Sequence, residues 1–266
     1  MRGSNPALND TFEDVFHDDG VYNDIMTLEG TVSKSMFLVV LLVAAAVGSW
    51  RFASMPSYAA HMQSVLIGCL ILAFITAMIT IFKKSMSPTT APAYALLEGA
   101  ALGIISHQYE SVYSGIVLQA IFLTVSVFFA LLLCYKSGLI QVTQNFRLAV
   151  VSATIGIFFV YIISFLGQFI GFSVPYLHES GPLGIGISLV IVGVAALNLV
   201  LDFDFIESGS ESGRLPGYME WYGAFGLLIT LVWLYIEILR LLAKLRDEWL
   251  KSRIFREKVI RDVGLY

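Results

Sequence analysis

The chain alternates long apolar runs with short polar loops, and this pattern sets the expected fold. A helix needs about 20 mostly apolar residues to cross a bilayer. Seven runs approach that length, and they cover residues 36–50, 65–82, 91–106, 112–134, 148–172, 183–201 and 222–242. None shows the strict alternation of a strand, which disfavours an outer-membrane barrel. The pattern predicts an all-α membrane protein, a bundle of seven transmembrane helices.

The composition excludes the main soluble classes of protein. Hydrophobic residues make up 57% of the 266 residues and charged residues 14%, and residues 31–201 hold only six Lys/Arg and three Asp/Glu. So few charges cannot cover a soluble domain of this size. A soluble globular domain, a disordered chain and a basic nucleic-acid-binding protein are therefore excluded. We expect a multi-pass protein whose main partner is the lipid bilayer of the cell (inner or plasma) membrane.

The remaining charges gather at the two ends of the chain. Residues 1–30 hold seven acids and one base, whereas residues 240–266 hold eight bases and four acids. We divide the chain into an acidic N-terminal tail (1–30), a transmembrane domain (31–243) and a basic C-terminal tail (244–266). Loop charges favour a cytoplasmic N-terminus, yet seven crossings would then place the basic tail outside. Either the loops break the positive-inside rule, or the third or seventh run does not fully cross.

Ionisable side chains inside apolar runs are candidate functional residues, because each costs about 2.5–3.5 kcal/mol on insertion scales. Near the end of the sixth run, Asn198 and Asp202 are four residues apart and share a helix face, whereas Asp204 lies on another face. These acids either take part in gating or ion binding, or are simply hydrated at the level of the lipid headgroups.

The seventh run offers a second polar set, Thr230, Glu237 and Arg240. Glu237 and Arg240 are three residues apart and would pair on their own helix. Alternatively, Arg240 extends to the membrane surface and Glu237 meets Asp202 or Asp204 of the neighbouring helix. Two carboxyl groups in contact share a proton at moderately acidic pH and repel each other once both ionise. Such a pair would form a pH-sensitive latch.

The third run contains Glu98 and two glycines, Gly99 and Gly103. Glu98 should face the interior of the bundle or a water path, where it has a functional role or a structural hydrogen bond. Its partner would be Lys83, Lys84 or a helix dipole. Glycines four residues apart let transmembrane helices approach closely. We expect them to lie at a helix–helix contact.

Other chemistry is weakly supported. His61, His107 and His178 fall in loops of one side with Glu110 and Glu179, but their spacing matches no metal motif, so we expect no metal site and no cofactor. The two cysteines lie within apolar runs and are expected to pack there. Serine-hydrolase, zinc-protease and phosphate-loop motifs are absent from the sequence. We therefore do not expect an enzyme.

Three stretches resemble the Bax inhibitor-1/YccA family, in particular the bacterial branch of these transmembrane Bax inhibitor motif proteins. They are residues 93–103, with the Glu-Gly pair, residues 196–207, and residues 218–242; the opening Ser-Asn-Pro-Ala-Leu is also similar. The resemblance implies a seven-helix bundle with its last helix near the centre. It also implies either a proton-sensitive calcium leak or a membrane stress protein connected with membrane proteolysis.

In characterised relatives, an acid at the end of helix six and one in helix seven form a pH-responsive pair. Asp202 matches the first acid. Thr230 stands near the expected second acid, and Glu237 follows two turns later, so either Glu237 substitutes or the paired latch is missing. We predict a calcium leak channel, with Ca²⁺ and protons as its ions, in which Asp202, Asp204, Glu237 and Glu98 sense protons or ions and Asn198, Thr230 and Arg240 support them. The alternative is a non-conducting regulator that binds other membrane proteins, such as a membrane protease.

Overall fold

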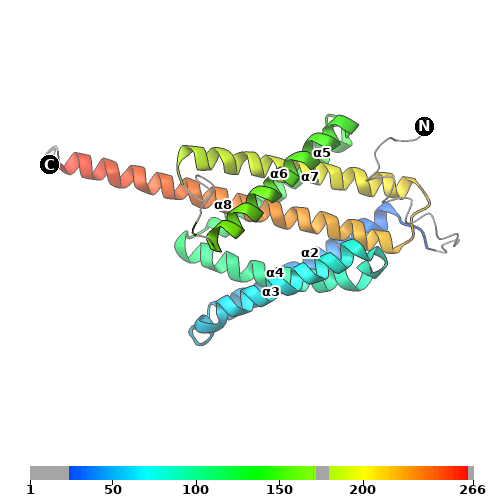
Figure 1. Ribbon diagram of the computed structural model, residues 1–266, viewed down its shortest axis with the longest axis horizontal. Helices are drawn as coiled ribbons and strands as arrows, with labels where there is room; N and C mark the ends of the chain where they lie inside the picture. Colours follow the sequence, from blue (N-terminus) through cyan, green and yellow to red (C-terminus); the bar gives the residue numbers. More distant parts are fainter. Residues whose placement is uncertain (1–23, 170, 172–179, 263–266) are drawn as a thin grey trace.

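A computed structural model describes residues 24–169, 171 and 180–262. Within these residues the chain forms seven α-helices and two short 3-10 helices, and its only β pairing is an isolated bridge. The α-helices are α2 (Leu28–Ala53), α3 (Met62–Phe82), α4 (Ser87–Val112), α5 (Ile116–Lys136), α6 (Gln144–Phe169), α7 (Pro182–Glu211) and α8 (Tyr218–Asp262). Successive helices run in opposite directions, and α2 begins at the end of the bundle opposite to the one where α8 leaves it (Figure 1).

The helical membrane architecture is confirmed, with one qualification for α4. Six of the helices are long and apolar enough to cross a membrane, and α4 is the exception among the described residues. Its 26 residues extend over about 39 Å at 1.5 Å per residue, so length is not the reason. α4 packs against α2, α3 and α8, and much of its surface faces protein rather than lipid. A seventh crossing by α4 stays a prediction.

The two glycines of α4 lie where this helix touches α2, as expected. A Cβ atom on Gly99 would stand 2.3 Å from the carbonyl oxygen of Leu42, and one on Gly103 would stand 2.1 Å from that of Ala46. Both positions are too close for any side chain. The absence of side chains therefore permits the close approach of two helix backbones, which is how helices associate in lipid.

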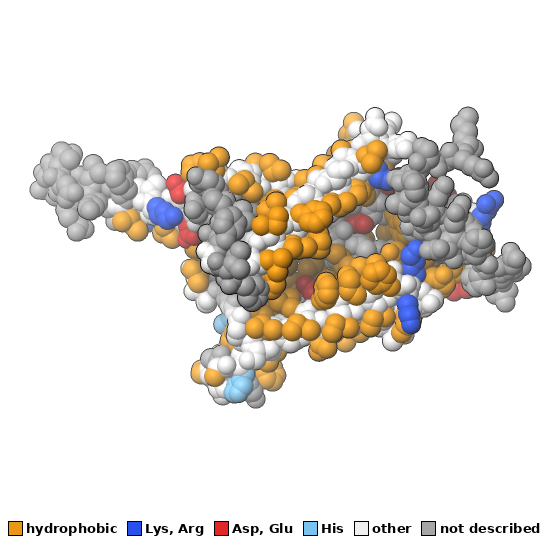
Figure 2. Space-filling view, in the orientation of Figure 1, with side chains coloured by type: hydrophobic (Ala, Val, Ile, Leu, Met, Phe, Trp, Pro, Cys, Tyr) orange, Lys and Arg blue, Asp and Glu red, His pale blue; other side chains and the backbone are white. Residues whose placement is uncertain are grey.

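The last helix, α8, lies near the centre of the bundle. It packs against α2, α4, α5 and α7 and is the most buried of the candidate spans. The outer helices expose large apolar side chains, which dominate the lateral face (Figure 2). At 45 residues, or about 67 Å, α8 is longer than the membrane is thick. Residues 244–262, which we assigned to a tail, therefore continue this helix.

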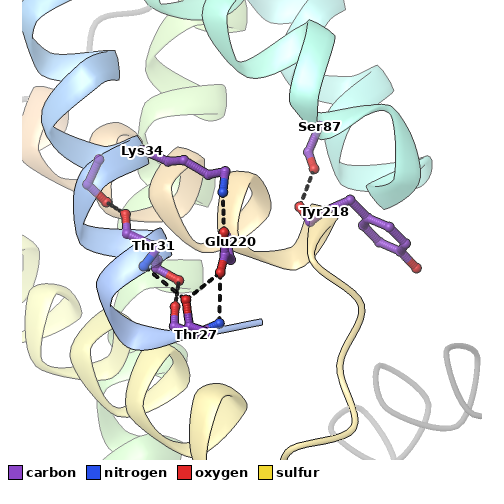
Figure 3. A network of polar contacts seen from close by, with 8 residues as sticks. Thr27, Thr31, Lys34, Ser87, Tyr218 and Glu220 are labelled. Carbon is purple, nitrogen blue, oxygen red and sulfur yellow. Dashed lines mark hydrogen bonds and ion pairs between the residues drawn. The ribbon is translucent and has the colours of Figure 1, made fainter. Parts of the chain in front are cut away.

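A polar network joins the starts of three helices at one end of the bundle (Figure 3). Glu220, in the first turn of α8, is only 5% exposed. Its Oε1 atom accepts hydrogen bonds from the backbone N–H of Thr27 at 2.8 Å and from its hydroxyl at 2.7 Å, and Lys34 of α2 pairs with its Oε2 atom. Ser87 of α4 donates to the carbonyl oxygen of Tyr218 at 2.8 Å. The network fixes α2 and α4 against the start of α8.

The positive-inside rule gives conflicting orientations in the structure as well, because the helices alternate in direction. The loops after α3, α5 and α7, with their lysines and arginines, lie at one end, and the basic extension of α8 leaves from the other. Basic side chains accordingly appear at both ends (Figure 2). The orientation in the membrane stays a prediction.

Candidate functional site

Asp202 of α7 points its carboxyl group at α8. Its Oδ2 atom is buried and has no hydrogen-bond partner among the described residues. Gly226 of α8 lies beside the other oxygen, since a Cβ atom there would be 3.7 Å from Oδ1. The side chain of Thr230, one turn further along α8, lies near the same carboxyl group, and its hydroxyl donates to the carbonyl oxygen of Gly226 at 3.2 Å. One carboxylate oxygen is thus left without a partner at a helix interface.

Asn198 joins the same segment of α7 to α6. Its Nδ2 atom donates to the hydroxyl of Thr154 on α6 at 2.8 Å and to the carbonyl oxygen of Val194 at 2.8 Å. Asn198 and Asp202 share a helix face in the sequence, and the structure uses that face to contact both α6 and α8. Asn198 therefore fixes the position of α7 without touching the Asp202 carboxyl group.

Asp204 is separate from this site. Its Oδ2 atom forms an ion pair with Arg147 of α6 at 2.5 Å, and the neighbouring acid Glu207 accepts a hydrogen bond from the hydroxyl of Tyr135 on α5. These acids thus connect the end of α7 to α5 and α6, and Asp204 carries its own counter-charge.

Glu237 belongs to a second polar cluster, with Tyr161 of α6 and Arg240. Glu237 is 1% exposed. The hydroxyl of Tyr161 donates to its Oε1 atom at 2.7 Å, and Nη1 of Arg240 donates to both carboxylate oxygens at 3.1 and 3.2 Å. The same Nη1 atom donates to the Tyr161 hydroxyl at 2.8 Å. Glu237 therefore pairs with Arg240 on its own helix, which is one of the two alternatives that the sequence left open.

The structure does not bring Glu237 to Asp202. Thr230 occupies the place opposite Asp202, and Glu237 follows it by seven residues, or about 10 Å along the helix. The second acid of the latch is therefore replaced by a hydroxyl group in this conformation.

Three buried polar residues of α8 lie on one face, which we name the polar stripe: Thr230, Glu237 and Lys244. They are spaced by seven residues, which returns to the same side of a helix, and they are 8%, 1% and 5% exposed. Nζ of Lys244 donates to Ser188 at 2.8 Å and to the carbonyl oxygen of Gly184 at 3.1 Å, both on α7. The stripe extends over about 21 Å of α8 and faces α6 and α7.

Glu98 lies apart from the polar stripe, in the buried part of α4. It is 8% exposed and lies within electrostatic range of Tyr94 and of Cys69 on α3. No ion pair joins it to Lys83 or Lys84 within the described chain. Glu98 is thus buried in the bundle, as expected, and of its possible partners a lysine is not seen in the described chain.

The histidines do not converge with acids on a metal site in the described part of the chain. His107 stacks edge-on against Trp50, with ring centroids 5.5 Å apart, and Glu110 accepts the backbone N–H of Gly115 at 2.5 Å at the start of α5. His178 and Glu179 lie outside the described residues. Both cysteines are free thiols.

Sequence reasoning missed Tyr161 and Lys244. The signal for Tyr161 is that it is the only hydroxyl-bearing ring in the run of residues 148–172. Because apolarity ends near residue 242, the sequence pattern assigns Lys244 to the basic tail, although its spacing of seven from Glu237 continues the stripe.

Comparison with known proteins agrees with the resemblance found in the sequence. A family model described as Bax inhibitor 1 like matches residues 5–247. That segment includes α2 to α7, the polar stripe and Asp202. No curated protein and no solved structure matches the chain. The chain, a multi-pass helical membrane protein by its architecture, therefore belongs to the Bax inhibitor 1 like family.

Proposed function

We propose that the protein is a pH-sensitive leak for cations, above all Ca²⁺, in the cell (inner or plasma) membrane, with no enzymatic role. Asp202 is its proton sensor. The observation that carries this proposal is the Oδ2 atom of Asp202, which is buried at the contact between α7 and α8 with no partner among the described residues.

The state of this carboxyl group determines how closely α7 and α8 can pack. An ionised carboxylate without a counter-charge costs several kcal/mol inside a protein or a membrane. A protonated carboxyl group avoids most of that cost, so the packing around Asp202 and Gly226 fits the protonated form. Ionisation requires water or a cation at Oδ2, and α7 must then separate from α8. We therefore expect the leak to open as the pH rises through the titration of Asp202.

The surrounding groups suit a hard cation. Ca²⁺ prefers carboxylate, carbonyl and water oxygens, and Asp202 and Thr230 supply a carboxylate and a hydroxyl at the start of the polar stripe. In this proposal Glu237 is not the second half of a carboxyl latch. Its charge is compensated by Arg240, and its role is to anchor α8 to α6 through Tyr161.

The test is Ca²⁺ flux into liposomes that contain the purified full chain, measured from acidic to neutral pH. We expect flux to rise with pH for the unmodified protein. Asp202→Asn, which imitates the protonated form, should show low flux at every pH. Asp204→Asn is the matched control, because Asp204 is already paired with Arg147, and it should keep the pH dependence. Absence of flux at every pH, or a normal pH profile in Asp202→Asn, would reject the proposal.

The second candidate function is a non-conducting regulator that binds membrane proteins, for example a membrane protease. The observation in its favour is the extension of α8, where Trp249 and Ile254 are 54% and 65% exposed beside basic residues. Removal of residues 251–266 distinguishes the two functions. A regulator loses its co-purifying membrane proteins in this variant, whereas a leak keeps its Ca²⁺ flux.

A further inference from the structure

A groove opens on the lateral face between α2 and α5. These two helices pack against α4 and α8 rather than against each other, so α4 and α8 form the floor. The groove has a volume of about 510 Å³. Aliphatic side chains dominate its walls and floor, among them Val43, Val47, Ile121 and Val125 in the walls and Leu102 and Leu231 on the floor.

The length of the groove corresponds to one leaflet of a bilayer. Along α2 its lining extends from Val39 to Arg51, a separation of twelve positions or about 18 Å at 1.5 Å per residue. One leaflet contributes about 15 Å of the hydrocarbon core. The groove thus begins near the middle of the membrane and ends at the membrane surface, where Trp50 and Arg51 stand.

The two ends of the groove differ in polarity. The hydroxyls of Ser106 and Tyr235, on the floor, hydrogen-bond to each other at 2.7 Å, so neither needs a polar ligand. Arg51 lies in the last turn of α2 and is exposed. It forms no ion pair with the acids of the described chain. The mouth therefore offers a guanidinium group without a counter-charge beside an indole ring, the pair that suits a lipid headgroup.

We propose that this groove binds an anionic phospholipid, with one acyl chain between α2 and α5 and the phosphate on Arg51. The apolar walls need an apolar occupant, and in a bilayer the acyl chain is available at that depth. The guanidinium group binds phosphate through two parallel hydrogen bonds. The choline of a zwitterionic lipid would place a second cation beside Arg51, whereas an anionic headgroup does not. The site therefore favours an anionic lipid. The bound chain supplies the contact that α2 and α5 do not make directly.

The test titrates the delipidated full chain, in detergent, with phosphatidylglycerol or with phosphatidylcholine of the same chain length. Native mass spectrometry counts the lipids bound. We expect phosphatidylglycerol to bind about tenfold more tightly, and Arg51→Gln to remove that preference, a change of about 1.4 kcal/mol. Lys136→Gln, at the opposite end of the bundle, is the charge control and should bind both lipids as the unmodified chain does. Equal preference in Arg51→Gln and the unmodified chain would overturn the proposal.

A second pair of variants tests the groove independently of Arg51. Val47→Trp places an indole ring inside the groove, whereas Val40→Trp places one on α2 outside it, at a position 65% exposed. Circular dichroism of both variants is used to check that they fold. We expect Val47→Trp to lose the tightly bound phosphatidylglycerol and Val40→Trp to keep it. Retention in both variants, or a second copy of the chain cross-linked into the groove from Val47→Cys, would show that the occupant is not a lipid.

Discussion

The cluster of Glu237, Tyr161 and Arg240 allows a quantitative prediction about how α8 is held. Glu237→Gln keeps the shape of the side chain but removes its negative charge. The carboxylate accepts three hydrogen bonds within this cluster, and the side chain is 2% exposed. Its removal therefore leaves the guanidinium group of Arg240 without a counter-charge.

The magnitude follows from the burial of the two partners. Breaking a buried ion pair by removing one partner costs about 3–5 kcal/mol. The side chain of Arg240 is 31% exposed, so part of its charge reaches water or headgroups, and we expect about 3 kcal/mol for Glu237→Gln. Tyr161→Phe removes one hydrogen bond between helices, which in membrane proteins averages about 0.6 kcal/mol and reaches about 1.7. We expect about 1 kcal/mol for that change.

The assay is equilibrium unfolding of the chain in mixed micelles by titration with dodecyl sulfate, followed by circular dichroism. A double-mutant cycle of Glu237→Gln with Arg240→Gln should give a coupling of about 2 kcal/mol. The cycle of Glu237→Gln with Asp202→Asn should be additive within about 0.5 kcal/mol, since Asp202 of α7 faces Thr230, about 10 Å from Glu237 along α8. Strong coupling between Glu237 and Asp202, with none between Glu237 and Arg240, would refute the assignment and restore the carboxyl latch.

Two further predictions concern packing and pH. Gly103→Ala should destabilise the bundle by about 1–3 kcal/mol through overpacking against the backbone of α2. Gly48→Ala is the control and should have no such cost, because open space surrounds Gly48. Equal unfolding curves for the two variants would contradict the close contact. Asp247 accepts a hydrogen bond from Tyr113, in the turn after α4, and raises the pKa of Tyr113 to about 12. Because the folded state holds this proton more tightly, its stabilising effect is complete below about pH 10, the ordinary pKa of tyrosine, and is lost as the pH rises to 12. The unmodified chain should therefore lose stability over that range more steeply than Tyr113→Phe, as unfolding midpoints at each pH will show.

The apolar runs of the sequence determined most of the fold. Backbone groups in lipid must pair within their own segment, so each long apolar run became a helix, and loops too short for other structure made neighbours antiparallel. The same reasoning found the glycine contact of Gly99 and Gly103. It also predicted a crossing for α4, although α4 is not apolar enough to count as a candidate span. Apolarity reflects contact with lipid, whereas α4 mostly contacts protein.

The candidate site depended on tertiary structure. Periodicity assigned Asp202 and Glu237 to faces of their helices, but it contains no information on the axial position of α8 against α7. Packing around Gly226 brought Thr230 to Asp202 and left Glu237 to Tyr161 and Arg240. Helix faces repeat along one chain and are readable from its sequence, whereas the alignment of two helices depends on side chains distant in sequence, and only the folded bundle decides it.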